Sequence, residues 1–242
     1  MRRMLAGLIV LALGMATAFA APAKPPVKPQ AKATAPVAVD ISGALALYSS
    51  GQPLRANEAE DAIVYFRPAK AVVPAPLAEP SVMTTRRKQF VPRVLAIPAG
   101  SSVRFPNEDT ILHNVFSRSP DNGFDAGLYG AGKGFVQTFE HPGLVKVYCN
   151  VHHSMYAYVL VLDTPYFARP DRDGRFLIAG VPEGEGELVV YHERGEPYRQ
   201  RLNVTGVQDL AVRMDLDRRK VPPHTNKFGK PYGRGGDEPT GY

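Results

Sequence analysis

The sequence predicts an all-β protein, with an antiparallel β-sandwich followed by a smaller β unit. Short runs of alternating apolar and polar residues recur through residues 39–217, and turns containing Gly or Pro separate them. No apolar run there follows the helical period convincingly, although a short helix within residues 119–132 fits the pattern. Many short strands with frequent turns are typical of sandwich folds.

Residues 1–20 have the pattern of a secretory signal peptide. Arg2 and Arg3 form a basic start, an apolar run covers residues 5–16, and small residues precede an expected cleavage after Ala20. The apolar run is short for a bilayer span, so no integral membrane segment is expected after cleavage. In a bacterium, this signal predicts a periplasmic protein.

Strands of the first unit follow an extended linker. Residues 21–38 are nearly all Ala, Pro and Lys, a composition that cannot bury a core. The expected strands are Ile41–Tyr48, Ala62–Phe66, Val94–Ile97, Ser102–Phe105, Asn114–Ser117, Leu144–Cys149 and Ala157–Leu162. Turns at residues 51–53 and 98–100 are expected to join the first two pairs, and residues 67–90 to form a surface loop. Residues 39–163 are therefore the first predicted domain.

The pattern of residues changes after residue 163. Four short strands separated by Gly or Pro turns are expected at Arg175–Ala179, Glu187–His192, Arg199–Val204 and Asp209–Leu216. Residues 164–217 are the second predicted unit. Residues 218–242 are basic and hold few apolar residues, so they are expected to be a disordered tail.

The net charge of +6 gives little support to nucleic-acid binding. Arg2 and Arg3 leave with the signal, and the basic tail holds most of the remaining excess, so the region between is nearly neutral. It has no basic stripe with interleaved aromatic residues, and no nucleic-acid partner is expected.

The chain has one cysteine, Cys149, which cannot form an internal disulfide. A buried structural thiol is one interpretation, because free cysteine packs as a small hydrophobe. The residues near Cys149 indicate a second interpretation, a metal site. His152 and Met155 follow within six residues, between two apolar strands, and His113 begins an upstream strand. Thiolate, thioether and imidazole together form the donor set of a mononuclear copper site with a weak axial methionine.

Two other chemistries compete with copper at these residues. Zinc binds cysteine and histidine, but zinc sites seldom use methionine. A Cys–His nucleophilic pair would need an orienting group and an oxyanion site, neither of which is identifiable in the sequence. No enzymatic activity is predicted.

The ligand pattern resembles that of the cupredoxins, closest to the amicyanin and plastocyanin group. His113-Asn114 matches the upstream pair of the family, and Cys149, His152 and Met155 match its ligand loop. The resemblance implies a Greek-key β-sandwich, one type 1 copper ion held by His113, Cys149, His152 and Met155, and electron transfer. It also implies that Asn114 and Asn150 support the ligand loops by hydrogen bonds.

Residues 40–217 also resemble bacterial exported proteins labelled methylamine-utilisation or cupredoxin-like, and residues 164–217 resemble transthyretin-like modules. The partner implied is a periplasmic redox protein such as a cytochrome or a dehydrogenase. A periplasmic copper carrier or storage protein that does not cycle is the alternative function.

His153 stands where the family often has proline, so it competes with His152 as a ligand. The spacing favours His152, with His153 and Tyr156 framing an exposed port for electrons. The remaining histidines, His141, His192 and His224, lack partners at ligand spacing and are expected at the surface.

Overall fold

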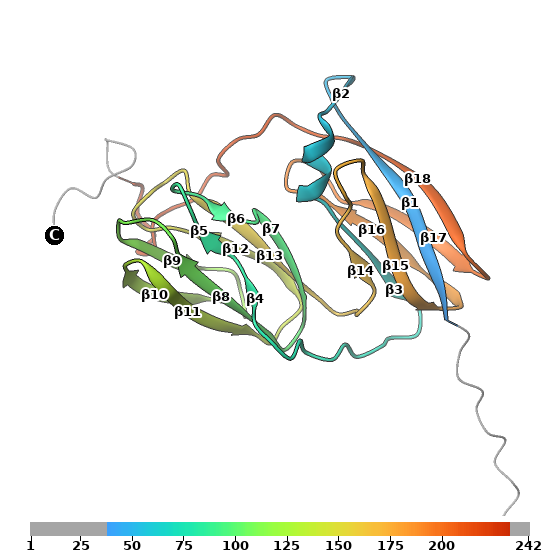
Figure 1. The fold of residues 1–242 in the computed structure, drawn as a ribbon, viewed down its shortest axis with the longest axis horizontal. Helices are drawn as coiled ribbons and strands as arrows, with labels where there is room; N and C mark the ends of the chain where they lie inside the picture. The colour runs from blue at the N-terminus through green and yellow to red at the C-terminus, as the bar shows by residue number, and fades with distance from the viewer. Residues whose placement is uncertain (1–37, 233–242) are drawn as a thin grey trace, which may run out of the picture. The chain divides into compact units, whose positions relative to one another are not determined.

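The computed structural model describes residues 38–232, which form two β-sandwiches (Figure 1). In this range the one helical segment is the 3-10 turn η1 (Ala56–Asp61), and no helix is long and apolar enough to cross a membrane. The expected all-β class is confirmed. The expectations for residues 1–20, and for the linker up to residue 37, lie outside the described residues.

One sandwich, here named the central sandwich, uses strands from residues 81–162. Its sheets have the strand orders β10-β9-β12-β13-β7 and β11-β8-β5-β6, with β4 beside β8. The strands are β4 (Ser81–Val82), β5 (Thr84–Thr85), β6 (Phe90–Val91), β7 (Val94–Pro98), β8 (Ser101–Asn107), β9 (His113–Ser117), β10 (Phe124–Tyr129), β11 (Gly132–Phe139), β12 (Gly143–Tyr148) and β13 (Tyr156–Leu162).

Strand β13 is buried on both of its faces, which explains its unbroken apolar sequence. Ala157, Val159 and Val161 point into the core of the central sandwich. Their alternating neighbours, among them Tyr158 and Leu160, belong to a different apolar cluster that also includes residues of β3 and β16. Because successive side chains of a strand point to opposite faces, a strand covered on both sides needs apolar residues throughout.

The other sandwich, here named the outer sandwich, is built from both ends of the described range. Its sheets have the orders β15-β1-β18, with β2 beside β1, and β14-β3-β16-β17. The strands are β1 (Ala38–Ser49), β2 (Gln52–Pro53), β3 (Ile63–Pro68), β14 (Phe167–Ala168), β15 (Arg175–Pro182), β16 (Gly184–Tyr191), β17 (Tyr198–Val204) and β18 (Gln208–Asp215).

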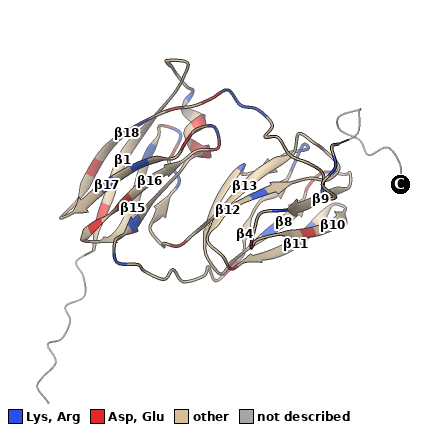
Figure 2. Cartoon of the chain, turned by 180° about the vertical axis from the view of Figure 1, so that it is seen from behind, with Lys and Arg blue, Asp and Glu red and all other residues tan. Residues whose placement is uncertain are grey.

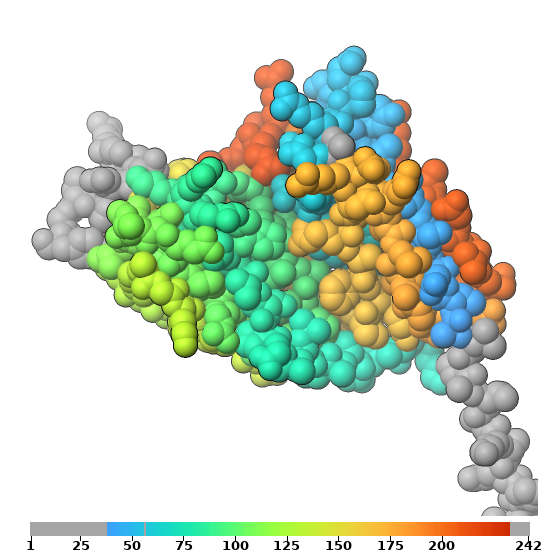
Figure 3. Space-filling view, viewed as in Figure 1, coloured from blue at the N-terminus to red at the C-terminus, as the bar shows by residue number. Residues whose placement is uncertain are grey.

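The predicted domain boundaries, 39–163 and 164–217, are therefore wrong. Residues 41–48 of β1 pair in parallel with residues 208–215 of β18, and the two segments lie side by side in Figures 1 and 3. Ile41 of β1 packs in one core with Phe176 and Val212. Alternating apolar and polar residues show that one face of a strand is buried, but they do not show which partner buries it. Grouping the strands by their order in the sequence therefore gave the wrong division.

Three local expectations are also corrected. Residues 119–132 contain strand β10 and the start of β11 rather than a helix. The turn at residues 98–100 does not close a hairpin, because β7 pairs with β13 whereas β8 pairs with β11. Likewise β1 and β3, on either side of the turn at residues 51–53, lie in different sheets.

His192, expected at the surface, is fully buried at the end of β16. Its Nε2 lies 3.3 Å from the carbonyl oxygen of Glu58 in η1, and its Nδ1 accepts a hydrogen bond from the Arg194 N–H. These two contacts fit a neutral ring protonated on Nε2. Burial is the main reason that its pKa is lowered to about 4 from the ordinary 6.5.

Because the folded pKa of His192 lies below 6.5, the unfolded chain takes up the proton first as the pH falls. The contribution of His192 to stability is complete above about pH 6.5 and is lost as the pH approaches 4. Between pH 6.5 and pH 4, we expect the unfolding free energy of the unchanged protein to fall by roughly 3 kcal/mol more than that of His192→Gln. The glutamine side chain cannot titrate, so the difference reports the protonation of His192. Urea unfolding at several pH values measures the difference, and parallel curves for the two proteins would contradict the assignment.

Candidate metal centre

The strand order of the first central sheet brings the predicted ligands to one end of the sandwich. Strand β9 runs antiparallel to β12, so the start of β9 at His113 lies at the end of β12. The loop 149–155 leaves β12 there and returns to β13, where Tyr148 pairs with Tyr156. Hydrogen bonds from the Cys149 N–H to the Met155 carbonyl and from the Met155 N–H to the His152 carbonyl close the loop.

Three ligand atoms converge in this loop region. Cys149 Sγ lies 3.8 Å from His113 Nδ1 and 3.8 Å from His152 Nδ1. All three ligand atoms lie within 4.8 Å of one another, and the three side chains are buried. Nitrogen at about 2.0 Å and sulfur at about 2.3 Å from a metal in trigonal arrangement lie roughly 3.7 Å apart. The spacing therefore fits one ion between them, and the His–Cys–His cluster fits a type 1 copper site.

His113 is oriented by a carboxylate. Its ring is fully buried, and its Nε2 lies 3.0 Å from Asp109 Oδ2. The hydrogen bond places the proton on Nε2 and leaves the Nδ1 lone pair facing the thiol. Burial lowers the pKa of His113, and Asp109 only partly opposes this effect, so the ring stays neutral and able to bind a cation.

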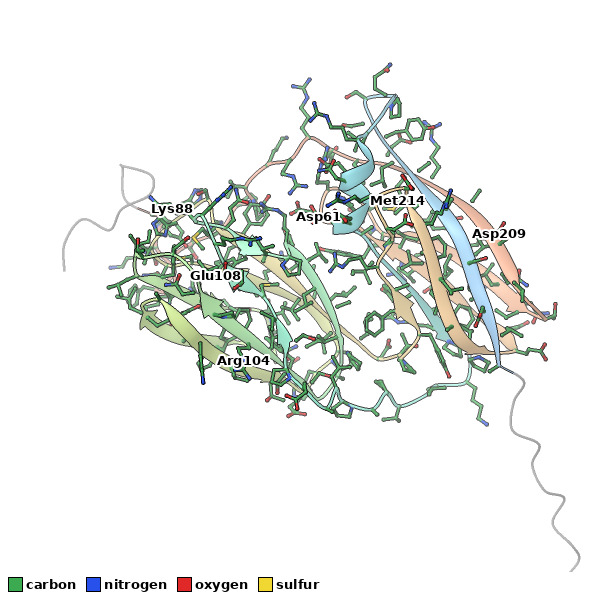
Figure 4. All side chains as sticks on the ribbon, viewed as in Figure 1. Asp61, Lys88, Arg104, Glu108, Asp209 and Met214 are labelled. Atoms are coloured by element: carbon green, nitrogen blue, oxygen red, sulfur yellow. The ribbon has the colours of Figure 1, made fainter. Side chains whose placement is uncertain are left out.

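A strained turn holds Asp109. Its two carboxylate oxygens accept hydrogen bonds of 2.6 Å from the Arg87 N–H and 2.8 Å from the Lys88 N–H. Both of these residues have positive φ, 53° and 55°, between the paired residues Arg86 and Gln89. Such a conformation costs a non-glycine residue about 1–2 kcal/mol. Figure 4 shows Lys88 and Glu108, the neighbour of Asp109, at the same end of the central sandwich.

Asn114 joins the two ligand segments, as the family resemblance implied. Its side-chain amide donates to Asp125 Oδ1 at 2.7 Å and to the Gly127 carbonyl at 2.9 Å. Its oxygen accepts a 3.3 Å hydrogen bond from the Asn150 N–H in the ligand loop. Asn114 therefore fixes the loop that carries Cys149 relative to β9 and β10.

The Cys149 thiol is fully buried yet surrounded by amide donors. Burial raises its pKa, and the backbone N–H groups of Asn114, Val151 and His152 oppose that rise. These N–H groups are aimed at the sulfur and stabilise negative charge on it. They lessen the effect of burial without cancelling it, so the pKa of the thiol stays above its ordinary value.

Met155 is buried in the same apolar cluster as Cys149 and is 1% exposed. It lies at the end of the ligand loop, next to the start of β13. Its thioether is the fourth donor that the sequence pattern predicts.

The residues expected to form an exposed electron port are largely covered. His152 is 3% exposed, and Tyr156 is 4% exposed with its hydroxyl donating to the Lys220 carbonyl. His153 is half-buried, because the ring of His224 stacks on it at 4.6 Å between centroids. The expectation of a disordered tail from residue 218 is thus wrong for residues 218–232, and His224 is not a free surface residue.

The sequence did not reveal Asp109, the turn at residues 86–89 or the contacts of residues 218–232. Asp109 lies four residues before His113, a signal that becomes meaningful only once the loop geometry is known. The other contacts join residues far apart in the sequence.

No family model and no curated protein matches this chain. Among solved structures, a copper-containing nitrite reductase from Thermus scotoductus SA-01 is similar, with 26% identity over 40% of this chain and a TM-score of 0.33. The match covers 25% of the reductase, so this chain spans only about a quarter of that protein's length.

Two smaller proteins are matched over nearly their whole lengths. A purple cupredoxin from Nitrosopumilus maritimus has 24% identity over 34% of this chain and 99% of its own, with a TM-score of 0.31. Amicyanin from Paracoccus versutus has 20% identity over 40% of this chain and 98% of its own, with a TM-score of 0.33. The metal assignment rests on the donor atoms described above.

Asn114→Ala should destabilise the central sandwich by about 2–3 kcal/mol, because it removes the three hydrogen bonds of a buried amide side chain. Urea unfolding of the metal-free protein measures the loss. Asn203→Ala is the matched control, since Asn203 is an exposed asparagine in β17, and its effect should stay within about 0.5 kcal/mol. Equal effects of the two substitutions would show that Asn114 does not connect the ligand segments.

Proposed function

We propose that this protein binds one copper ion through His113, Cys149, His152 and Met155 and transfers single electrons with it. The observation that carries the proposal is the approach of one thiol and two imidazole Nδ1 atoms to 3.8 Å inside an apolar cluster. Thiolate and imidazole with a weak thioether donor form the type 1 copper donor set.

Copper bound there would supply one-electron chemistry by alternating between its cuprous and cupric states. The roles of the residues follow from their surroundings. Cys149 supplies the negative charge, stabilised by the backbone N–H groups around it. His113 and His152 supply neutral nitrogen donors, and Met155 supplies a soft thioether that discriminates against zinc.

Rigid support of the ligands suits electron transfer. Asp109 fixes the His113 ring, and Asn114 fixes the loop around Cys149. Ligands held by such partners keep their positions when the charge of the ion changes, so little structural rearrangement accompanies the transfer. We further propose export to the periplasm, a redox protein as the partner, and no enzymatic reaction at this site.

Copper storage without redox cycling is the second candidate function. It is favoured by the burial of the ligands, since His113 and Cys149 are 0% exposed and His152 is 3% exposed. Reversible oxidation and reduction of the copper-loaded protein, measured by voltammetry, would support electron transfer. Copper that stays in one oxidation state would support storage.

Copper-loaded protein should show an intense visible band from thiolate-to-copper charge transfer, at one ion per chain. Cys149→Ser should abolish the band, because the serine hydroxyl stays protonated and is a hard oxygen donor that cannot supply a thiolate-to-copper transition. Titration with cupric ion, followed by absorption, measures both properties. A Cys149→Ser protein that keeps the band would refute the site.

His152→Ala should weaken copper binding by more than the roughly 10–100-fold that loss of an outer partner costs. His153→Ala should leave the spectrum nearly unchanged and weaken binding far less than His152→Ala, because its ring stacks on His224 rather than facing Cys149. Competition with a chelator of known affinity measures both variants. The reverse order of effects would mean that His153, and not His152, is the ligand.

A further inference from the structure

Residues 217–232, here named the strap, leave β18 and run along the end of the central sandwich that carries the ligand loop (Figure 1). The segment has no strand or helix of its own, and only a short turn at residues 226–230 is closed by internal hydrogen bonds. Its order must therefore come from contacts with the rest of the chain.

Ion pairs anchor the first part of the strap. Arg219 Nη2 lies 3.2 Å from Glu58 Oε2 and 2.9 Å from Asp61 Oδ2, both in η1. Its Nη1 lies 3.0 Å from Oε1 of Glu193, whose side chain is 2% exposed. Figure 2 shows the acidic residues of η1 in red, and Figure 4 labels Asp61 there. A guanidinium shared by three carboxylates, one of them buried, forms a network stronger than a single exposed pair.

An aromatic stack fixes the middle of the strap. The ring of His224 lies between Tyr148 and His153, at centroid distances of 4.1 Å and 4.6 Å and interplanar angles of 9° and 4°. Tyr232 closes the stack edge-on against His153 at 4.9 Å. Tyr148 precedes Cys149 in the sequence and His153 follows His152, so the stack joins the two sides of the ligand loop.

Hydrogen bonds attach the end of the strap to the ligand loop itself. The Tyr232 hydroxyl donates to the Cys149 carbonyl at 2.9 Å, and the Lys227 N–H donates to Asn150 Oδ1 at 3.0 Å. The Lys227 ammonium also pairs at 2.8 Å with Asp125, whose other oxygen binds Asn114. The strap therefore contacts two successive loop residues and the network that supports them.

We propose that the strap is a built-in cover of the metal centre, which holds the ligand loop in its binding conformation and limits access to Cys149 and its partner ligands. This inference rests on the proposed copper site, which it deepens. Metal ions and thiol reagents reach the ligands only when the strap detaches. Aromatic stacking and neutral hydrogen bonds are individually weak, so closure is favoured but reversible.

The decisive experiment compares the full chain with a chain ending at Asp217 and with His224→Ala. The rate at which metal-free Cys149 reacts with an aromatic disulfide reagent measures access without copper. The rate at which a cuprous chelator removes copper from loaded protein measures retention. Both rates should rise tenfold or more in the two variants, which corresponds to about 1.4 kcal/mol of closure. Thermal unfolding confirms that each variant is folded.

Two controls isolate the strap. A chain ending at Tyr232 keeps every strap contact described here and should react as slowly as the full chain. Phe228→Ala removes a ring of the strap that is 70% exposed and should also leave both rates unchanged. If the chain ending at Asp217 does not fold, His224→Ala alone decides.

The outcomes separate the strap from the copper proposal. Equal Cys149 reactivity in the full chain and in folded His224→Ala would overturn the cover, whether or not copper binds. Fast reaction of the chain ending at Tyr232 would also overturn it. A full chain that protects Cys149 but forms no cysteine-dependent copper band would support the cover and refute the proposed function.

Discussion

The approach of one thiol and two imidazole nitrogens inside a closed apolar cluster is the constraint on which this end of the molecule depends. Asp109 accepts a hydrogen bond from the Nε2–H of His113, which turns the Nδ1 lone pair of this ring toward Cys149. Each of the two Nδ1 atoms lies 3.8 Å from the sulfur, and groups around the site hold the three side chains together. The support is visible in the amide donors around the sulfur and in the hydrogen bonds of Asn114. The site is organised before any metal arrives.

The outer sandwich determines where the strap begins. Parallel pairing of β1 with β18 fixes the end of β18, and Leu216 there packs in the same core as Ile41. Arg219 follows three residues later, within reach of the carboxylates of η1. The two ends of the described chain thus make one sandwich that positions the cover of a site located in the middle of the sequence. The cover depends on pairing between residues more than 160 positions apart.

The sequence predicted those features that depend on residues close to one another in the chain. Strand β13 reads as an apolar run because both of its faces are buried, and the spacing of Cys149 and His152 places both in one tight loop. The sequence did not predict features that depend on contacts between residues far apart in the chain. The residues of β1 could not reveal that β18 completes their sheet. The strap has few apolar residues, so its composition indicated disorder, whereas its order comes from ring stacking, ion pairs and hydrogen bonds to remote residues. The sequence suggested a short helix within residues 119–132, yet β10 lies there, and Gly127, with φ of 69°, stands at the irregularity in its pairing with β9.

The strap bears on the choice between the two candidate functions. Release of copper requires ligand displacement, and the strap opposes it because Tyr232 and Lys227 hold residues 149–150 in place. A carrier would have to break these contacts, and the ion pairs of Arg219 behind them, in every cycle of delivery. Electron exchange requires no atom to leave the site. A protein that keeps its ion while electrons pass can therefore keep the cover closed. The same contacts that would impede a carrier are compatible with the proposed electron-transfer centre and with copper storage, so the strap argues against delivery of copper, and redox cycling of the bound ion distinguishes the remaining two functions.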